Sequence, residues 1–220
     1  MKIMIHACPS REWYVNEFLI PSLEEQGADD IQVWMDSEGR GNLESTMASF
    51  AYLGKYSGGT WHLQDDVIIC HDFMERAQAN DDGVVCGYGN QQFGPFIGTT
   101  GRAPVAFHWW SFPCIRIPNE YAGACAEWFR KEAQYKEVYR SHIYYKNGDD
   151  TIFRDWLTWE SRCDHVTNLV PNLVDHIDWL IGGPTVNKQR EHPARAFYFN
   201  DQYLVDALAE KLATRASNAV

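Results

Sequence analysis

The sequence predicts an α/β fold in which a central sheet lies between layers of helices. The N-terminal half alternates strand-like and helix-like segments at the spacing of βαβ units, which favours a mostly parallel sheet. Hydrophobic residues make up 45% of the 220-residue chain and aromatic residues 14%, which is enough apolar material for one sizeable core. The sequence contains no internal repeat and no linker that would divide it. We therefore expect a single domain over residues 1–220.

The elements of the N-terminal half follow from their apolar patterns. A buried strand is expected over residues 2–6, followed by a helix that Ser10 is suited to cap, and a second strand is expected over residues 31–35. A glycine-rich loop then leads to a helix with Asn42 as its expected cap. The apolar face of this helix carries Leu43, Met47, Phe50 and Leu53.

The C-terminal half is expected to extend the sheet in a different way. Two strand-like segments, residues 104–110 and 113–117, are separated by only two residues, which predicts a hairpin or a mixed-sheet extension. Helices are expected from Asn119 to about Gln134 and from near Gly148. The last expected elements are strands over 165–171 and 195–199 and a helix that buries Leu204, Leu208 and Leu212.

Composition narrows the class of protein. The formal charge of −11 disfavours a surface that tracks nucleic-acid phosphates, although a local basic groove stays open, and it suits a protein that concentrates divalent cations. No apolar window approaches the roughly 18 residues needed to span a bilayer, so we expect no stable membrane insertion and a cytoplasmic location. The six cysteines never form a Cys-x-x-Cys pair, and we expect them to be reduced core residues: Cys8, Cys70, Cys86, Cys114, Cys125 and Cys163.

Two adjacent acids at the end of an apolar strand are the most informative feature. The strand begins near Trp61 and ends in Asp65-Asp66, after which apolar residues resume. Neighbouring carboxylates at a buried strand end repel each other unless a cation or a strong hydrogen-bond network neutralises them. The pair therefore predicts a divalent metal.

Three polar groups are expected to meet at one edge of the sheet. Pro9-Ser10-Arg11 follows the first strand, Asp36 follows the second, and the acid pair ends the third. Ligands of open α/β sheets bind at the carboxyl ends of the strands, where strand order reverses. Taken singly, Ser10 is equally suited to be only a helix cap and Asp36 only a turn residue. Their shared position favours a common binding crevice.

The segment Leu63-Gln64-Asp65-Asp66-Val67 resembles the Asp-x-Asp region of GT-A-fold glycosyltransferases, and the order of the parts is also similar to that family. The resemblance implies a Rossmann-like three-layer α/β/α fold with a central mixed, mostly parallel sheet. It further implies a nucleotide-sugar-binding half over residues 1–100. Residues 101–220 would form the acceptor half with a C-terminal metal and lid segment, and residues 181–193 are either that lid or disordered. Small bacterial and phage members are the nearest in pattern, which would place a phage-encoded chain in the host cytoplasm.

The same resemblance implies the cofactor, Mn²⁺ or Mg²⁺, and its ligands. Asp66 is the expected ligand, and Asp65 is a metal, ribose or sugar contact. Gln64 stands where the family often has an acid and can hydrogen-bond a ribose or sugar hydroxyl. A late His176 within Pro-x-Leu-Val-x-His is implied as a further ligand, which suits Mn²⁺ better than Mg²⁺. Alternatively, His176 caps a loop or packs in the core. The expected nucleotide-sugar contacts are Pro9, Ser10, Arg11, Asp36, Arg40, Gln64 and Asp65.

A second acid pair, Asp149-Asp150, opens the helix that follows Gly148. Carboxylates at a helix start are favoured in any protein by capping and by the helix dipole. The resemblance implies instead that this pair holds the catalytic base of an inverting enzyme. On that interpretation Asp150 accepts the proton of the acceptor hydroxyl, and Asp149 orients the acceptor or caps the helix.

These observations predict a metal-dependent glycosyltransferase that moves a sugar from a nucleotide-sugar, with a UDP-sugar as the leading donor, to a hydroxyl acceptor. Inversion is the expected outcome because it needs only one base. The acceptor stays open among polysaccharide precursors, proteins and modified DNA bases. Two alternatives also stay open. One is a metal-dependent nucleotidyl or phosphoryl transferase, although the chain has no Gly-x-x-x-x-Gly-Lys-Ser/Thr loop. The other is a catalytically inactive module with a GT-A-like fold that binds a nucleotide or carbohydrate.

Overall fold

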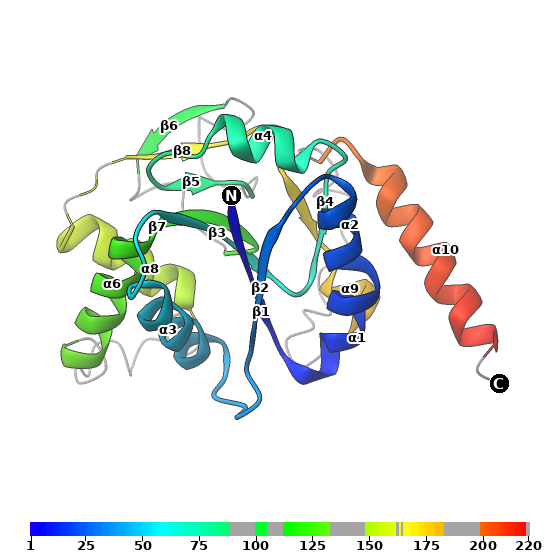
Figure 1. Cartoon of the computed structure of the whole chain (residues 1–220), viewed down its shortest axis with the longest axis horizontal. Coiled ribbons are helices and arrows are strands. Elements are labelled where there is room, and N and C mark those ends of the chain that lie inside the picture. The colour runs from blue at the N-terminus through cyan, green and yellow to red at the C-terminus, as the bar shows by residue number, and fades with distance from the viewer. Residues whose placement is uncertain are drawn as a thin grey trace.

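A seven-stranded sheet lies at the centre of the molecule, with helices on both sides (Figure 1). The computed structural model describes residues 1–88, 100–104, 112–132, 148–161, 163, 165–182 and 199–218. In this part of the chain the strand order is β2-β1-β3-β7-β5-β8-β6. The strands are β1 (Lys2–Ala7), β2 (Asp30–Met35), β3 (Gly59–Gln64), β5 (Val85–Cys86), β6 (Gly101–Pro104), β7 (Cys114–Pro118) and β8 (His165–Asn168).

Five of the seven strands run in the same direction. Strand β1 pairs in parallel with β2 and β3, and β5 pairs in parallel with β8. Strand β7 is antiparallel to both β3 and β5, and β6 is antiparallel to β8. The predicted fold class, α/β with a mixed and mostly parallel central sheet flanked by helices, is therefore confirmed.

The helical elements divide between the two faces of the sheet (Figure 1). The stretch after β1 is continuous from Pro9 to Glu25, and it widens into a π turn just before Pro21, whose ring nitrogen cannot donate a hydrogen bond. The helical elements are η1 (Pro9–Arg11), α1 (Glu12–Tyr14), η2 (Val15–Leu19), α2 (Ile20–Glu25), α3 (Asn42–Leu53), α4 (Phe73–Ala79), α6 (Asn119–Lys131), α8 (Asp149–Trp159), α9 (Asp178–Ile181) and α10 (Gln202–Asn218).

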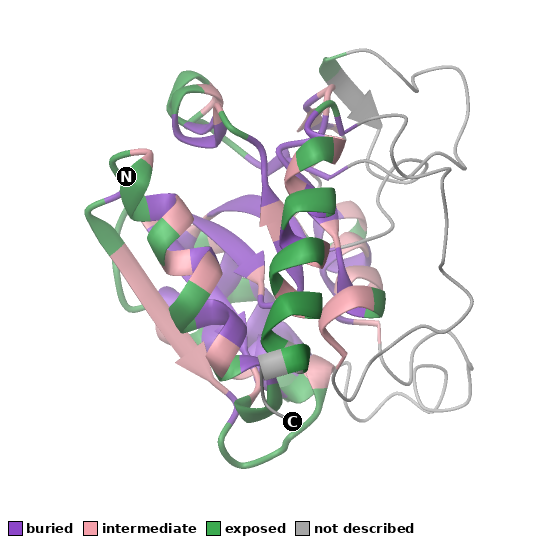
Figure 2. Ribbon diagram, turned by 90° about the vertical axis from the view of Figure 1, so that its right-hand side faces the viewer, coloured by how far each residue is buried: buried purple, intermediate pink, exposed green. Residues whose placement is uncertain are grey.

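Two apolar cores lie on opposite faces of the sheet because neighbouring strand residues point to opposite sides. Ile3 and Ile5 of β1 pack with the first helical stretch, α4 and α10, whereas Met4 packs with α3, α6 and α8. Figure 2 shows the inner strands buried and α10 exposed along its outer side. Three layers result, with the sheet between two layers of helices.

A separate two-stranded ribbon joins distant parts of the chain. It pairs β4 (Val67–Ile69), directly after the acid pair, with β9 (Val174–His176) in antiparallel register, so that Val67 faces His176. The amide of Ile177 donates to the carbonyl of Asp66 at 2.8 Å. The ribbon therefore carries a C-terminal segment to the end of β3.

Several local predictions need correction. Ser10 lies inside η1 and Asn42 is the first residue of α3, and neither side chain caps its helix. Instead, both carboxylate oxygens of Asp36 accept amides of the preceding loop, from Arg40 at 3.1 Å and Gly41 at 3.2 Å. Of the two arrangements expected for the segment 113–117, the mixed-sheet extension is present, because β7 lies between β3 and β5 and is antiparallel to both. The expected strand at 105–110 and most of those at 195–199 and of the loop at 181–193 lie outside the described residues.

Two compositional predictions can also be compared with the structure. All six cysteines are free, and four of them are buried. Among the described residues, none of the helices combines the length and the apolar character that crossing a bilayer would require.

Candidate functional site

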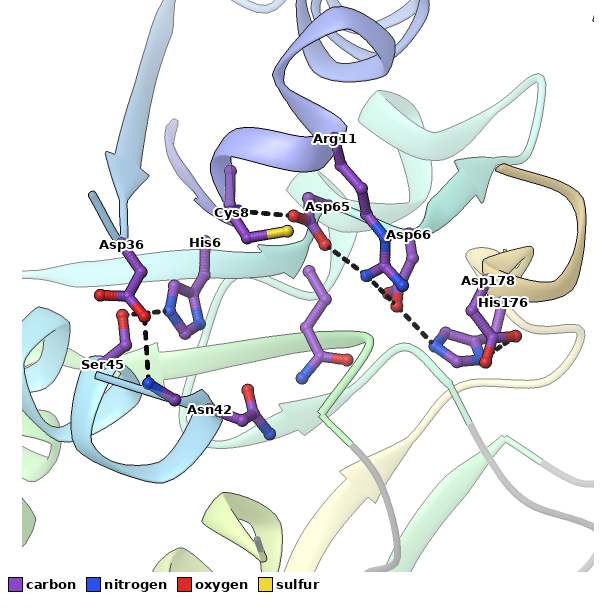
Figure 3. A pocket seen from close by; sticks show the side chains of 13 residues that line it. His6, Cys8, Arg11, Asp36, Asn42, Ser45, Asp65, Asp66, His176 and Asp178 are labelled. Atoms are coloured by element: carbon purple, nitrogen blue, oxygen red, sulfur yellow. Dashed lines mark hydrogen bonds and ion pairs between the residues drawn. The ribbon is translucent and has the colours of Figure 1, made fainter. Parts of the chain in front are cut away.

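A pocket of about 300 Å³, lined largely by residues with polar side chains, lies at the carboxyl ends of β1, β2 and β3 (Figure 3). The parallel register of these strands brings their last residues together, with His6 of β1 opposite Trp34 of β2 and Gln64 of β3. The described residues that line the pocket are His6, Ala7, Cys8, Arg11, Asp36, Gly41, Asn42, Ser45, Gln64, Asp65, Asp66, His176 and Asp178. The expected convergence of strand-end groups is thus present for Arg11, Asp36 and the acid pair.

Arg11 joins the two adjacent acids. Its Nη1 donates to Asp65 Oδ1 at 2.9 Å and to Asp66 Oδ2 at 2.6 Å, and all three side chains are buried. Its Nε donates to the carbonyl of Gly182 at 2.7 Å. The other oxygen of Asp65 accepts the Cys8 amide at 2.7 Å. A guanidinium is therefore the cation that neutralises the acid pair in this structure, supported by a backbone amide.

The electrostatic consequences differ between the two acids. Burial and the adjacent charge of Asp66 raise the pKa of Asp65. Burial would also raise the pKa of Asp66, but His176 and Arg11 together hold it below its ordinary value. Asp66 is therefore the carboxylate that retains its charge most firmly.

His176 lies between two carboxylates at the end of the pocket opposite Asp36 (Figure 3). Its Nε2 is 3.1 Å from Asp66 Oδ2, and its Nδ1 is 3.3 Å from Asp178 Oδ1. The pairing of β4 with β9 accounts for this contact between residues that are far apart in the sequence. Asp178 orients the ring in the way that carboxylates orient metal-ligating histidines in other proteins.

The residues at this end of the pocket are chemically suited to a divalent cation. Asp66 Oδ1 is buried and accepts no hydrogen bond from the described residues, so its lone pairs are available. Two carboxylates and an imidazole form a donor set that Mn²⁺ accepts readily. Arg11 neutralises the charges of Asp65 and Asp66 in this structure. A metal ion and this arginine would therefore compete for the same carboxylates.

A different group brings three potential ligand atoms within 4.8 Å of one another among the described residues: Cys70, Asp72 and Asp201. Its charges already have partners. Asp201 accepts from the amide and the ring of His71 at 2.9 Å, and Arg76 lies 3.6 Å from Asp72. We assign no metal to this group.

The other predicted contact residues are divided between the pocket and the surface. Gln64 lines the pocket, and Asp36 is buried there while it holds the loop before α3. Pro9 and Ser10 are exposed and are not among the described lining residues. Arg40 pairs with Glu38 at 2.7 Å and lines a groove over α3 and α6 instead.

The acids Asp149 and Asp150 also do not line the pocket among its described residues. Asp150 Oδ1 accepts the amide of Thr151 at 2.6 Å and its hydroxyl at 3.2 Å, which is a local turn at the start of α8. Asp149 is buried, and its Oδ2 accepts the Thr46 hydroxyl at 3.0 Å. Burial and the charge of Asp150 raise the pKa of Asp149 to about 7. Thr46 lies on α3 next to the pocket residue Ser45.

Sequence reasoning missed four polar lining residues: His6, Asn42, Ser45 and Asp178. His6 was expected only as the end of a buried strand, although its place beside the strand-end acids was a usable signal. Ser45 lies near the start of α3 and is a buried polar residue in a helix whose other buried residues are mostly apolar. Burial lowers the pKa of His6 to about 4, against the attraction of Asp36 and Asp66, so the ring is neutral near pH 7.

Comparisons with known proteins find a limited likeness. No protein-family model and no curated protein matches the chain. The solved structure of A197 from STIV is similar with 14% identity and a TM-score of 0.45, over 80% of this chain and 86% of that one. A mannose-1-phosphate geranyltransferase from Thermus thermophilus is similar with 13% identity and a TM-score of 0.39, over 76% and 74%. The functional proposal therefore rests on the residues of the pocket.

Replacing Arg11 by Gln is expected to destabilise the metal-free protein by about 3 kcal/mol, because removing one partner of a buried ion pair leaves uncompensated charge. Denaturant unfolding without divalent ions measures the loss. Arg215→Gln is the matched control, since its pair with Glu17 is half exposed and should contribute less than about 1 kcal/mol. Equal losses in the two variants would show that Arg11 does not neutralise the acid pair.

Asp149→Asn is expected to change how stability depends on pH. Because Asp149 binds its proton more tightly in the folded state, it stabilises that state fully at pH values below 3.8, its ordinary pKa. This contribution is lost as the pH rises from 3.8 to about 7. The lowered pKa of His6 acts in the opposite direction. Burying this ring costs stability at low pH, where the unfolded chain binds a proton that the folded chain does not, and this cost disappears as the pH rises from about 4 to 6.5. The variant should therefore gain more stability than the wild type between pH 4 and 7.

Denaturant midpoints across this range provide the measurement. Asp30→Asn, which alters an exposed acid at the opposite end of β2, should follow the wild-type curve. Parallel curves for Asp149→Asn and the wild type would contradict the assignment of Asp149 as a buried group that holds a proton.

Proposed function

We propose that the chain is a metal-dependent glycosyltransferase that moves a sugar from a nucleotide-sugar to a hydroxyl acceptor. The observation that carries this proposal is the gathering of Asp65, Asp66, Arg11 and His176 around one end of the strand-end pocket. The volume of about 300 Å³ is at the lower end of the range for small-molecule sites.

The donor is proposed to lie along the pocket. Its diphosphate would sit at the end near Asp66 and His176, and its sugar would be directed toward the part of the pocket that Ser45 lines (Figure 3). Gln64 lines the pocket and offers an amide to a ribose or sugar hydroxyl. The backbone amides of Arg40 and Gly41 donate to the Asp36 carboxylate and hold it against the loop before α3.

Arg11 is proposed to have two partners in turn. Without a donor it neutralises the acid pair through the two hydrogen bonds of its Nη1. With a divalent ion on the acids, its guanidinium becomes available for a phosphate, for which the planar fork of arginine is well suited. This exchange would make donor binding and metal binding mutually dependent.

Asp66, Asp65 and His176 are the residues proposed to hold the metal, with Mn²⁺ preferred over Mg²⁺ because of the imidazole. When bound, the ion would neutralise the charge that develops on the departing nucleoside diphosphate. Inversion is proposed, with one carboxylate at the start of α8 accepting the proton of the acceptor hydroxyl. A UDP-sugar is the first donor to test.

Asp66→Asn is expected to abolish Mn²⁺-dependent binding of UDP or GDP in a chain that still folds, with a loss of stability of up to about 3 kcal/mol because Arg11 and His176 lose a buried partner. Calorimetric titration of the nucleotide with and without Mn²⁺ measures the affinity. Asp30→Asn, the same substitution at an exposed position away from the pocket, serves as the control and should bind as the wild type does. Unchanged affinity in Asp66→Asn would remove this residue from the metal site.

The reaction products separate the candidate activities. A screen of nucleotide-sugars with Mn²⁺ should release nucleoside diphosphate, because donors of this class are slowly hydrolysed even without an acceptor. Release of pyrophosphate from a nucleoside triphosphate and a sugar phosphate would establish a nucleotidyltransferase instead. Binding of a nucleotide without turnover of any donor would establish a binding module.

A further inference from the structure

Two consecutive hydroxyls of α3 hold both ring nitrogens of His6. Ser45 Oγ lies 2.7 Å from Nε2, and Thr46 Oγ1 lies 3.3 Å from Nδ1 (Figure 3 shows the Ser45 contact). Thr46 in turn donates to Asp149 Oδ2 at 3.0 Å. The four side chains form a continuous chain of hydrogen bonds, with Ser45 and His6 lining the pocket and Asp149 buried behind it.

The direction of each bond follows from the donor capacity of the groups. A threonine hydroxyl has one proton, and Thr46 gives it to the ionised Asp149 carboxylate, so Thr46 accepts from His6 when Asp149 is charged. His6 must therefore carry its proton on Nδ1. Since a neutral imidazole has one donor and one acceptor, Nε2 accepts from the hydroxyl of Ser45. The chain is thus directed from the pocket toward Asp149.

His6 stays neutral because of what surrounds it. Its ring packs against His62, with ring centroids 5.6 Å apart, and His62 packs against Phe50 and Phe112. The charged groups that act on His6 are Asp36 and Asp66, and burial outweighs their attraction. A neutral ring is what a relay needs, because an imidazolium has no acceptor nitrogen.

We propose that Ser45, His6 and Thr46 form a proton relay that connects the pocket to Asp149, which serves as the proton acceptor in the reaction. This inference rests on the proposed function and goes beyond it, because it identifies Asp149 as the base and three positioning residues that deliver the proton. Asp150, whose Oδ1 is engaged by Thr151, does not have this role.

The relay moves one proton without changing the charge of its middle members. The acceptor hydroxyl transfers its proton to Ser45 Oγ as its oxygen forms the glycosidic bond and the nucleoside diphosphate leaves with the electron pair of the old bond. Ser45 passes its own proton to His6 Nε2, His6 Nδ1 passes one to Thr46, and Thr46 passes one to Asp149. At the end His6 is in the other tautomer and Asp149 is neutral.

Asp149 is suited to this role by its surroundings. Burial and the charge of Asp150 keep its affinity for a proton near that of water-exposed histidines, with a pKa of about 7. The Thr46 hydroxyl acts in the opposite sense by stabilising the carboxylate. A base with its pKa close to the working pH is the most effective kind.

The direction of the relay is measurable without a substrate. Nitrogen-15 NMR of histidine-labelled full-length protein, with His6 assigned from a His6→Gln variant, should show His6 neutral and protonated on Nδ1 above the pKa of about 7 of Asp149, where that carboxylate is ionised. Protonation on Nε2 would overturn the relay as drawn, whatever reaction the protein catalyses.

The catalytic role is measured by nucleoside diphosphate release with the best donor and acceptor. Thr46→Val should lower turnover by a factor on the order of 10², the range for losing general-base assistance, with donor affinity retained. Thr46→Ser keeps the hydroxyl and should restore most of the rate. Wild-type turnover should rise with pH through about 7 as Asp149 ionises, and Thr46→Val should lose that rise.

Full turnover and an unchanged pH profile in Thr46→Val would overturn the relay while leaving the proposed transferase intact. Absence of turnover in the wild type with every donor would overturn the proposed function and the catalytic role of the relay together. The tautomer measurement still distinguishes these failures, because it needs no donor or acceptor.

Discussion

The neutralisation of Asp65 and Asp66 is the constraint on which the rest of the site depends. Two unit charges 4 Å apart interact by about 4 kcal/mol at an effective dielectric of 20, a large share of a typical net stability of about 5 to 15 kcal/mol. Burial of both carboxylates at the end of a central strand therefore requires positive charge and hydrogen-bond donors. Arg11, the Cys8 amide and His176 supply these here.

That requirement links three distant parts of the chain. Arg11 comes from the turn after β1, and it also binds the carbonyl of Gly182 just after α9. His176 comes from β9, which reaches the acids only because it pairs with β4. Arg11 and His176, which both contact the acid pair, thus form one side of the pocket. A cation that displaces Arg11 would also break its hydrogen bond to Gly182 in the C-terminal segment.

Much of the fold and part of the site could be predicted from the sequence. The βαβ spacing, the apolar face of α3 and the strand that ends in Asp65-Asp66 are local patterns, and the topology of parallel strands brings their ends together. The partner of Arg11 could not be predicted, because a guanidinium can reach a phosphate or a carboxylate and only the side-chain path decides. The contact of His176 with Asp66 was implied only by a family resemblance, since the β4–β9 pairing joins segments that are far apart in the sequence. The chain from His6 to Asp149 joins a strand and two helices, and no sequence period marks it.

A crystal structure of the protein with Mn²⁺ and UDP would show whether a divalent ion replaces Arg11 on the acid pair. We expect an anomalous manganese peak bound by Asp66 and His176, with the Arg11 guanidinium turned from the carboxylates to the diphosphate. Arg11 still bridging Asp65 and Asp66, with no manganese beside them at saturating concentrations, would contradict this expectation.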